Sequence, residues 1–259
     1  MGARLAPAPP GVQAEDADLV VFGVVPAGDD ADDVGGAVDD PDVGLVVGDG
    51  VAAVVAPVRA GFSRPRRADL LRHHAVLDAL VASGAVAPVR FGTVLPDEAA
   101  VAGFLAEQRD PLRAVLERLA GRRQHNLRVE HVEEAVLADL VARDQEVRRL
   151  RERTRDLPEE ASYRDRVRLG ELVAHALEQR SAEAAVVVLD AIAGLAEVRV
   201  RREPSATQAV DAALLVDVER EQELVDRLEE LAAEHHEVLR VRLVGPMAPY
   251  DFAGDVPWA

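Results

Sequence analysis

The stretch VRLVGPMAPYDFAGD, residues 241–255, closes the last predicted β-strand of the chain and redirects the backbone. Alternating apolar residues predict a strand over 239–244, and Gly245 with Pro246 ends it. Only 3% of the chain is aromatic, yet three aromatic residues follow within ten positions of the end: Tyr250, Phe252 and Trp258. We therefore expect this tail, residues 245–259, to dock back onto the fold or onto a partner.

The segments before this tail alternate between strand and helix patterns. Strands are predicted at 127–132, 197–202, 209–218 and 239–244, and helices at 133–155, 163–195 and 219–236. The two long helical segments, joined by a link that contains Pro158, predict an antiparallel hairpin within 133–195. The order β-α-β-β-α-β predicts a modified ferredoxin-like domain over residues 125–259, with this helical hairpin inserted.

The N-terminal half has a different pattern. Residues 1–17 are rich in Ala and Pro and are predicted to be a disordered leader. Strands are predicted at 18–25 and 85–91, a tight hairpin at 44–55 around Asp49 and Gly50, and helices at 68–83 and after Pro96 and Pro111. The helix 68–83 is expected to bury a stripe of Leu70, Leu71, His74, Leu77, Leu80 and Val81. Together these elements predict an α/β domain with a small sheet over 18–124, so the whole chain is predicted to be an α+β protein of two domains.

Charge and composition exclude several classes of partner. The formal net charge of the 259-residue chain is −17, and a strongly acidic surface argues against nucleic acid and anionic membranes. The chain contains no Cys, which excludes disulfides and thiolate chemistry. The N-terminus lacks the apolar core of a secretory signal, and no run of 18 apolar residues occurs. These features predict a soluble, cytoplasmic protein.

Catalytic and metal-binding motifs are absent from the sequence. The glycines of GLVVGDG belong to a hairpin and not to a phosphate-binding turn, and no Ser lies in a G-x-S-x-G motif. Adjacent His pairs at 73–74 and 235–236 point about 100° apart on a helix and do not share an ion. The acidic segment 26–42 lacks the closing Glu of a calcium loop. We predict no enzyme activity, no cofactor and no metal.

Three segments together resemble one family. They are HHAVLDALVASG at 73–84, PVRFGTVLP at 88–96 and GPMAPYDFA at 245–253. In this combination the chain is similar to the gas vesicle accessory proteins of the GvpF/GvpL family, and it departs from the family pattern at Met247 and Ala248, where Trp and Pro are usual. The matching residues are candidates for binding a partner: Arg90, Phe91, Gly92, Thr93, Gly245, Pro246, Pro249, Tyr250 and Phe252.

The resemblance implies a function in gas vesicle assembly. It implies a protein that binds the small hydrophobic shell protein, limits its aggregation, acts with other accessory proteins and is in some members a minor vesicle component. Strand addition to a sheet edge and capture of an amphipathic helix are both open as binding modes. We further expect Tyr250 and Phe252 to pack near Phe91. Two alternatives are a small-molecule-binding regulatory module and a coiled-coil scaffold acting through 133–195.

Overall fold

The computed structural model describes residues 18–27, 38–59 and 66–254. The predicted leader 1–17, most of the acidic segment 26–42 and Trp258 lie outside these ranges. The chain divides into two compact units, one made of Met1–Gln124 with Pro246–Ala259 and the other of His125–Gly245. The tail from Pro246 onward therefore belongs to the first unit, although the sequence predicted a domain of residues 125–259 that includes it.

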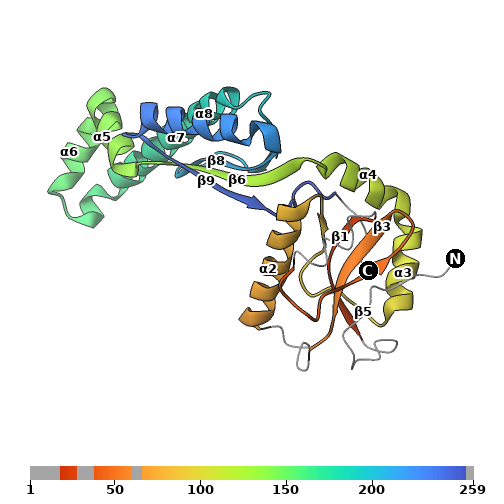
Figure 1. The fold of residues 1–259 in the computed structure, drawn as a ribbon. Coiled ribbons are helices and arrows are strands. Elements are labelled where there is room, and N and C mark those ends of the chain that lie inside the picture. Colours follow the sequence, from red (N-terminus) through yellow and green to blue (C-terminus); the bar gives the residue numbers. More distant parts are fainter. Residues whose placement is uncertain (1–17, 28–37, 60–65, 255–259) are drawn as a thin grey trace. The chain divides into compact units, whose positions relative to one another are not determined.

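The first unit contains a five-stranded antiparallel sheet (Figure 1). The strands are β1 (Leu19–Pro26), β2 (Gly44–Val47), β3 (Val51–Pro57), β4 (Ala87–Pro88) and β5 (Val94–Leu95). Their order is β2-β3-β1-β4, and β5 also pairs with β1. The predicted hairpin joins β2 to β3, and Gly50 at its turn has φ 80°, a conformation that favours Gly.

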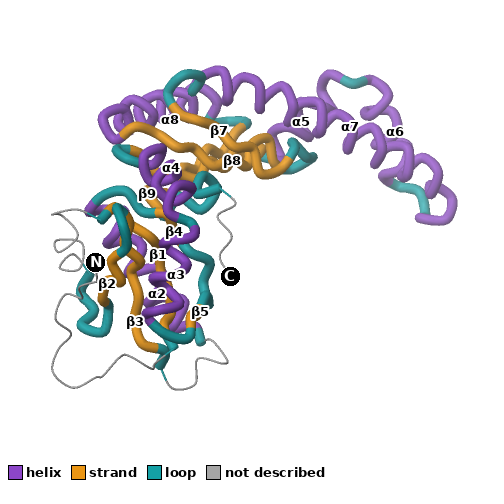
Figure 2. Tube along the Cα trace, turned by 90° about the vertical axis from the view of Figure 1, so that its right-hand side faces the viewer, coloured by secondary structure: helices purple, strands orange, loops and turns teal. Residues whose placement is uncertain are grey.

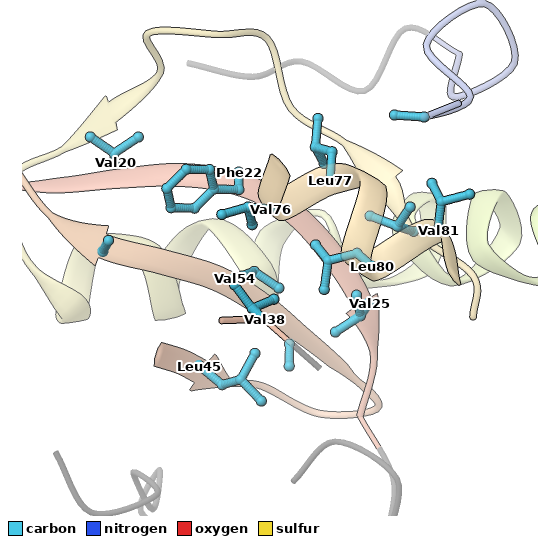
Figure 3. Packing of buried hydrophobic residues seen from close by; sticks show 14 residues of the cluster. Val20, Phe22, Val25, Val38, Leu45, Val54, Val76, Leu77, Leu80 and Val81 are labelled. Carbon is cyan, nitrogen blue, oxygen red and sulfur yellow. The ribbon is translucent and has the colours of Figure 1, made fainter. Parts of the chain in front are cut away.

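Helices cover both faces of this sheet. On one face α2 (Arg67–Ser83) packs Val76, Leu77 and Leu80 against Phe22 and Val54 (Figure 3). On the other face α3 (Glu98–Glu107) and α4 (Arg109–Leu119) pack against the alternate side chains of the same strands. Because both faces are covered, β1 and β3 are almost continuously buried, as their β-branched and small apolar sequences require.

The buried stripe of α2 differs from the predicted one. Leu70 and Leu71 are 39% and 56% exposed, and His74 is also exposed. His73 is buried at 1% exposure and heads the stripe that continues through Val76 and Leu77. The prediction that His74 is buried is wrong. Local apolar spacing does not show which distant side chains pack around the imidazole at position 73.

The predicted strand 85–91 is shorter in the structure. Only Ala87–Pro88 pairs as β4, because Pro88 has no N–H for a further ladder bond and the chain then turns before β5. The segment nevertheless stays on β1, since Val89 N–H donates to the Phe22 carbonyl at 2.9 Å and Val21 N–H donates to the Thr93 carbonyl at 3.0 Å.

The second unit contains a four-stranded sheet with strand order β7-β8-β6-β9. Its strands β7 and β8 and the helices α7 and α8 can be followed in Figure 2. Its elements are β6 (Arg122–His131), α5 (Glu133–Arg143), α6 (Gln145–Arg155), α7 (Glu159–Ala191), β7 (Ala196–Arg202), β8 (Gln208–Asp217), η2 (Val218–Arg220), α8 (Glu221–His235) and β9 (Leu239–Met247). Helices α7 and α8 cover one face of the sheet, where Val188, Leu214 and Leu224 are fully buried.

The helical segment between β6 and β7 is divided more finely than predicted. One helix was expected over 133–155, but Asp144 separates α5 from α6 because its carboxylate accepts from the backbone N–H groups of Glu146 (2.8 Å) and Val147 (3.0 Å). After Pro158, α7 starts four residues earlier than the predicted 163 and ends at Ala191 instead of 195. Helix α6 packs along α7 as the predicted hairpin requires.

Candidate functional site

The segment PVRFGT forms a tight turn at the end of β4. Thr93 N–H donates to the Arg90 carbonyl at 3.2 Å, and the Thr93 hydroxyl donates to the same carbonyl at 2.9 Å. Gly92 has φ 91°, whereas no described non-glycine residue has a positive φ. A negative followed by a positive φ at the two central positions is the pattern of a type II turn, which favours Gly at the second of them.

The tail is anchored in the first unit by backbone turns and buried side chains. Tyr250 N–H donates to the Ala248 carbonyl at 2.9 Å, and Phe252 N–H donates to the Pro249 carbonyl at 3.0 Å. Ala248 belongs to the apolar cluster beneath α2, and Phe252 has 0% exposure. Ala248 is one of the two positions that depart from the family pattern, and its small side chain is buried in this cluster.

A second anchor joins the tail to the start of β6. The buried side chain of Gln124 donates from Nε2 to Asp251 Oδ2 at 2.7 Å, and its Oε1 accepts from Asp251 N–H at 3.2 Å. This two-point contact fixes the side-chain orientation of Gln124 and the backbone at Asp251. No local sequence pattern identifies either residue, because their contact joins positions 127 residues apart.

Tyr250 links the tail to both other signature segments. Its hydroxyl donates to the Val89 carbonyl at 3.1 Å and lies 2.9 Å from Nε2 of His73. Because the single hydroxyl hydrogen is directed to Val89, the network assigns the proton of the imidazole to Nε2, which then donates to the tyrosine oxygen. The helix 73–84, the turn 88–96 and the tail therefore meet at one hydrogen-bonded group.

His73 is surrounded by aromatic rings. Its ring centroid lies 5.5 Å from that of Phe22 and 5.4 Å from that of Phe91, the latter in an edge-on arrangement. Its Nδ1 is buried and makes no hydrogen bond to another described residue. The guanidinium of Arg72 lies 5.6 Å from the centroid of the Phe22 ring and pairs with Asp40 at 2.6 Å.

These surroundings keep the His73–Tyr250 pair uncharged near neutral pH. Burial lowers the pKa of His73 to about 4, the nearby His74 acts in the same direction, and the Val89 backbone acts weakly against them. Burial also raises the pKa of Tyr250 to about 12. A neutral, oriented pair of this kind stabilises the packing of the tail, and the space that His73 lines with Phe22 and Phe91 is only about 10 Å³.

The candidate binding residues fall into two groups. Arg90, Gly92 and Tyr250 are exposed at the surface, with Tyr250 at 41% despite its bonded hydroxyl. Pro249 and Phe252 are buried and hold the tail. Phe91 and Thr93 are half-buried, while Gly245 and Pro246 stand at the division between the second unit and the first. Tyr250 was expected to pack near Phe91, and its hydroxyl bonds to the carbonyl of Val89, two residues before Phe91. The packing of Phe252 near Phe91 stays a prediction.

The remaining histidines do not gather into a metal centre. Within residues 18–27, 38–59 and 66–254, no three His, Asp or Glu side chains are grouped closely enough to hold a metal ion. His131 and His235 both line an apolar hollow of about 200 Å³ in the second unit, where burial lowers the pKa of His131. None of the described helices has the length and apolar character needed to cross a membrane.

Comparison with known proteins identifies the family. The family model "Gas vesicle synthesis protein GvpL/GvpF" matches residues 19–254. The chain belongs to the GvpL/GvpF family. Gas vesicle protein F of a Streptomyces species is 36% identical over 222 residues, which are 85% of this chain and 91% of that protein. Gas vesicle protein F of a Nostoc species is 26% identical over 191 residues, 72% of this chain and 78% of that protein.

Solved structures share the fold. The crystal structure of the gas vesicle protein GvpF from Anabaena sp. is matched with a TM-score of 0.75 at 24% identity, over 92% of this chain and 98% of that chain. The GvpF structure from Microcystis aeruginosa is matched with a TM-score of 0.71 at 21% identity, over 92% and 99%. GvpL/GvpF proteins are a gas vesicle family and not a known family of enzymes, so the protein has a gas vesicle-related role.

Proposed function

We propose that this protein is a gas vesicle assembly factor that binds the hydrophobic shell protein and limits its aggregation before or during vesicle formation. The observation that carries the proposal is the family match over residues 19–254 together with the convergence of the three signature segments at Tyr250. The proposal includes action in the cytoplasm and alongside other accessory proteins, with retention as a minor vesicle component.

The chemistry of the partner explains why such a factor is useful. A shell subunit with a water-free face exposes a large apolar patch and unpaired strand edges, and both promote aggregation until they are covered. A partner with a net charge of −17 repels its own copies, so complexes between the two proteins stay apart in solution. This reasoning supports a holding role and requires no catalysis, cofactor or metal.

The exposed part of the signature surface is the candidate contact in the first unit. Arg90 and Gly92 at the turn, Val94 beside it and the ring of Tyr250 present a mixed surface of apolar and cationic groups. Phe252 and Gln124 hold this surface from beneath by burial and hydrogen bonding. We infer that the buried signature residues position the surface and that the exposed ones contact the partner.

The two units support the proposal of two separately folding domains. The strand order β7-β8-β6-β9 with the element order β-α-β-β-α-β supports a ferredoxin-like second domain, in which α5, α6 and α7 replace a single crossover helix. We infer that each unit has its own core and folds separately, with boundaries near residues 124 and 245.

Co-production of the full-length protein with the shell protein tests the proposed function. The wild-type protein should keep the shell protein in the supernatant and co-purify with it, and Arg90→Glu should weaken both effects. Arg155→Glu is a matched control, because Arg155 is exposed on α6 and neither arginine makes an ion pair within the described residues. If the shell protein aggregates equally with and without the wild-type protein, the proposed function is wrong.

A further inference from the structure

A groove in the second unit runs between α8 and the end strand of the sheet, β9. It has a volume of about 390 Å³. Its apolar wall is made by Val225, Leu228, Ala232, Val241 and Leu243, and the ion-paired His125 and Glu221 line it as well. Glu229 stands among them and makes no ion pair or hydrogen bond within the described part of the chain. The groove is therefore a partly apolar surface with a free carboxylate, and no contact described above accounts for it.

The strand that borders this groove has a free edge. In the order β7-β8-β6-β9, β9 has β6 as a neighbour on one side and no described strand on the other. Such an edge presents backbone N–H and C=O groups to an incoming strand. Pro246 lacks an N–H and limits the usable edge to the residues before it. About seven residues, 239–245, remain, which is enough for a strand of ordinary length.

The two faces of β9 differ in character. Val241 and Leu243 are half-buried and pack toward the apolar core on the α8 side. Arg240 and Arg242 alternate with them, so they point to the opposite face, where both are exposed and make no ion pair within the described residues. A strand added beside β9 would therefore meet the partly apolar groove on one face and two guanidinium groups on the other.

We propose that β9 and the groove beside α8 form a docking surface for an extended segment of a partner, which adds to the sheet as a fifth strand. Alternate apolar side chains of that segment enter the groove next to Val241 and Leu243. The side chains between them carry carboxylates and pair with Arg240 and Arg242. The inference rests on the proposed function, because it takes this amphipathic strand to be a segment of the shell protein.

Charge complementarity selects this occupant over a second copy of the same chain. Two β9 strands pairing edge to edge would bring the arginines of one copy close to those of the other, and like charges on facing strands are destabilising. Arginine on an edge strand is also a known protection against self-association. A helix lying in the groove would bury apolar surface but would leave the backbone N–H and C=O groups of β9 unpaired.

A pair of variants at adjacent positions of α8 tests the groove. Ala232 lines it and is half-buried, whereas Ala233 is exposed and does not line it. In full-length protein co-produced with the shell protein, Ala232→Arg should lower the recovered shell protein by about tenfold or more, and Ala233→Arg should leave it unchanged. Arg242→Glu should also weaken recovery by repelling the partner carboxylates, in contrast to Arg155→Glu. The melting temperature of each purified variant is measured as a check that the variant is folded.

Amide hydrogen exchange identifies the mode of binding. Residues 239–245 should gain protection in the complex with the shell protein, as backbone pairing requires. The inference is wrong if the shell protein binds but the gain in amide protection occurs outside residues 239–245. It is also wrong if Ala232→Arg binds the shell protein as the wild type does, or if light scattering shows that Ala232→Arg dissociates a homo-oligomer. These outcomes leave the proposed function standing, whereas a complete absence of shell-protein binding by the wild type contradicts that function itself.

Discussion

The hydroxyl oxygen of Tyr250 lies 2.9 Å from Nε2 of His73, although the two residues are 177 positions apart in the chain. The same hydroxyl donates to the Val89 carbonyl at 3.1 Å. This one group therefore closes the tail onto both the helix and the turn that carry the family signatures.

Removing the hydroxyl of Tyr250 should destabilise the first unit. Tyr250→Phe keeps the ring but leaves Nε2 of buried His73 and the Val89 carbonyl without their partner, and an unsatisfied buried polar group costs about 1–3 kcal/mol. Urea unfolding of the full-length protein measures the loss. The control is Tyr163→Phe on α7, because Tyr163 is 63% exposed and its hydroxyl bonds to no described residue. Equal stabilities for the two variants would contradict the role assigned to the Tyr250 hydroxyl.

Acidification should destabilise the protein through His73. Its pKa is about 4 in the folded state against 6.5 for the free side chain, so the unfolded state binds more protons between these values. Stability from this residue is complete above pH 6.5 and falls as the pH drops toward 4, by a total of about 3 kcal/mol. His131, whose pKa is also lowered by burial, acts in the same direction.

The variant His73→Gln separates the contribution of His73 to the pH dependence of stability from the contributions of the other titratable groups. It should flatten the dependence of unfolding free energy on pH between 4 and 6.5, although it also lowers the stability at pH 7. His236→Gln is the matched control, because His236 is exposed. A slope that is unchanged in His73→Gln would show that His73 is not the titrating group.

The turn at Gly92 should not tolerate a side chain. Gly92 has φ 91°, and nothing lies within 4 Å of the position that a Cβ would take, so the cost of Gly92→Ala is a backbone cost of about 1 kcal/mol. Gly103 is a matched control with equally open space, but it lies inside α3, so Gly103→Ala should stabilise by about 0.5–1 kcal/mol. Thermal unfolding should show a lower melting temperature for Gly92→Ala and a higher one for Gly103→Ala. Changes of the same sign in the two variants would refute the assigned turn.

Truncation of Phe252 should cost more than any of these changes. The side chain has 0% exposure, and Phe→Ala in a core typically costs about 3–5 kcal/mol. We expect Phe252→Ala to lower the melting temperature and shell-protein recovery together, and Phe252→Leu to lose a smaller part of both. Retained stability with lost recovery would instead identify the tail as a direct contact surface, and no change in either would make the tail a passive end.

Local sequence patterns predicted an element well where the turn or cap residues that define it lie within a few positions of one another. Asp49 and Gly50 predicted the hairpin between β2 and β3, and Gly48 N–H closes it on the Val51 carbonyl at 2.8 Å. Acidic residues after Pro96 predicted the start of α3, where Asp97 accepts from Ala100 N–H at 2.7 Å. The break at Asp144 was also a local cap, but a continuous apolar stripe on both sides concealed it.

The sequence by itself determined the family, because the residues of the turn and the tail identify it wherever they lie in space. It also determined most of the segments that form strands and helices, since caps, turns and periodicity act over a few residues, but it missed the short strand β5 and the break between α5 and α6. Only the tertiary structure decided that His73 and not His74 is buried, that Gln124 binds Asp251, and that the tail joins the first unit. Each of these depends on contacts between residues far apart in the chain, which local spacing does not encode because they form only when the chain packs.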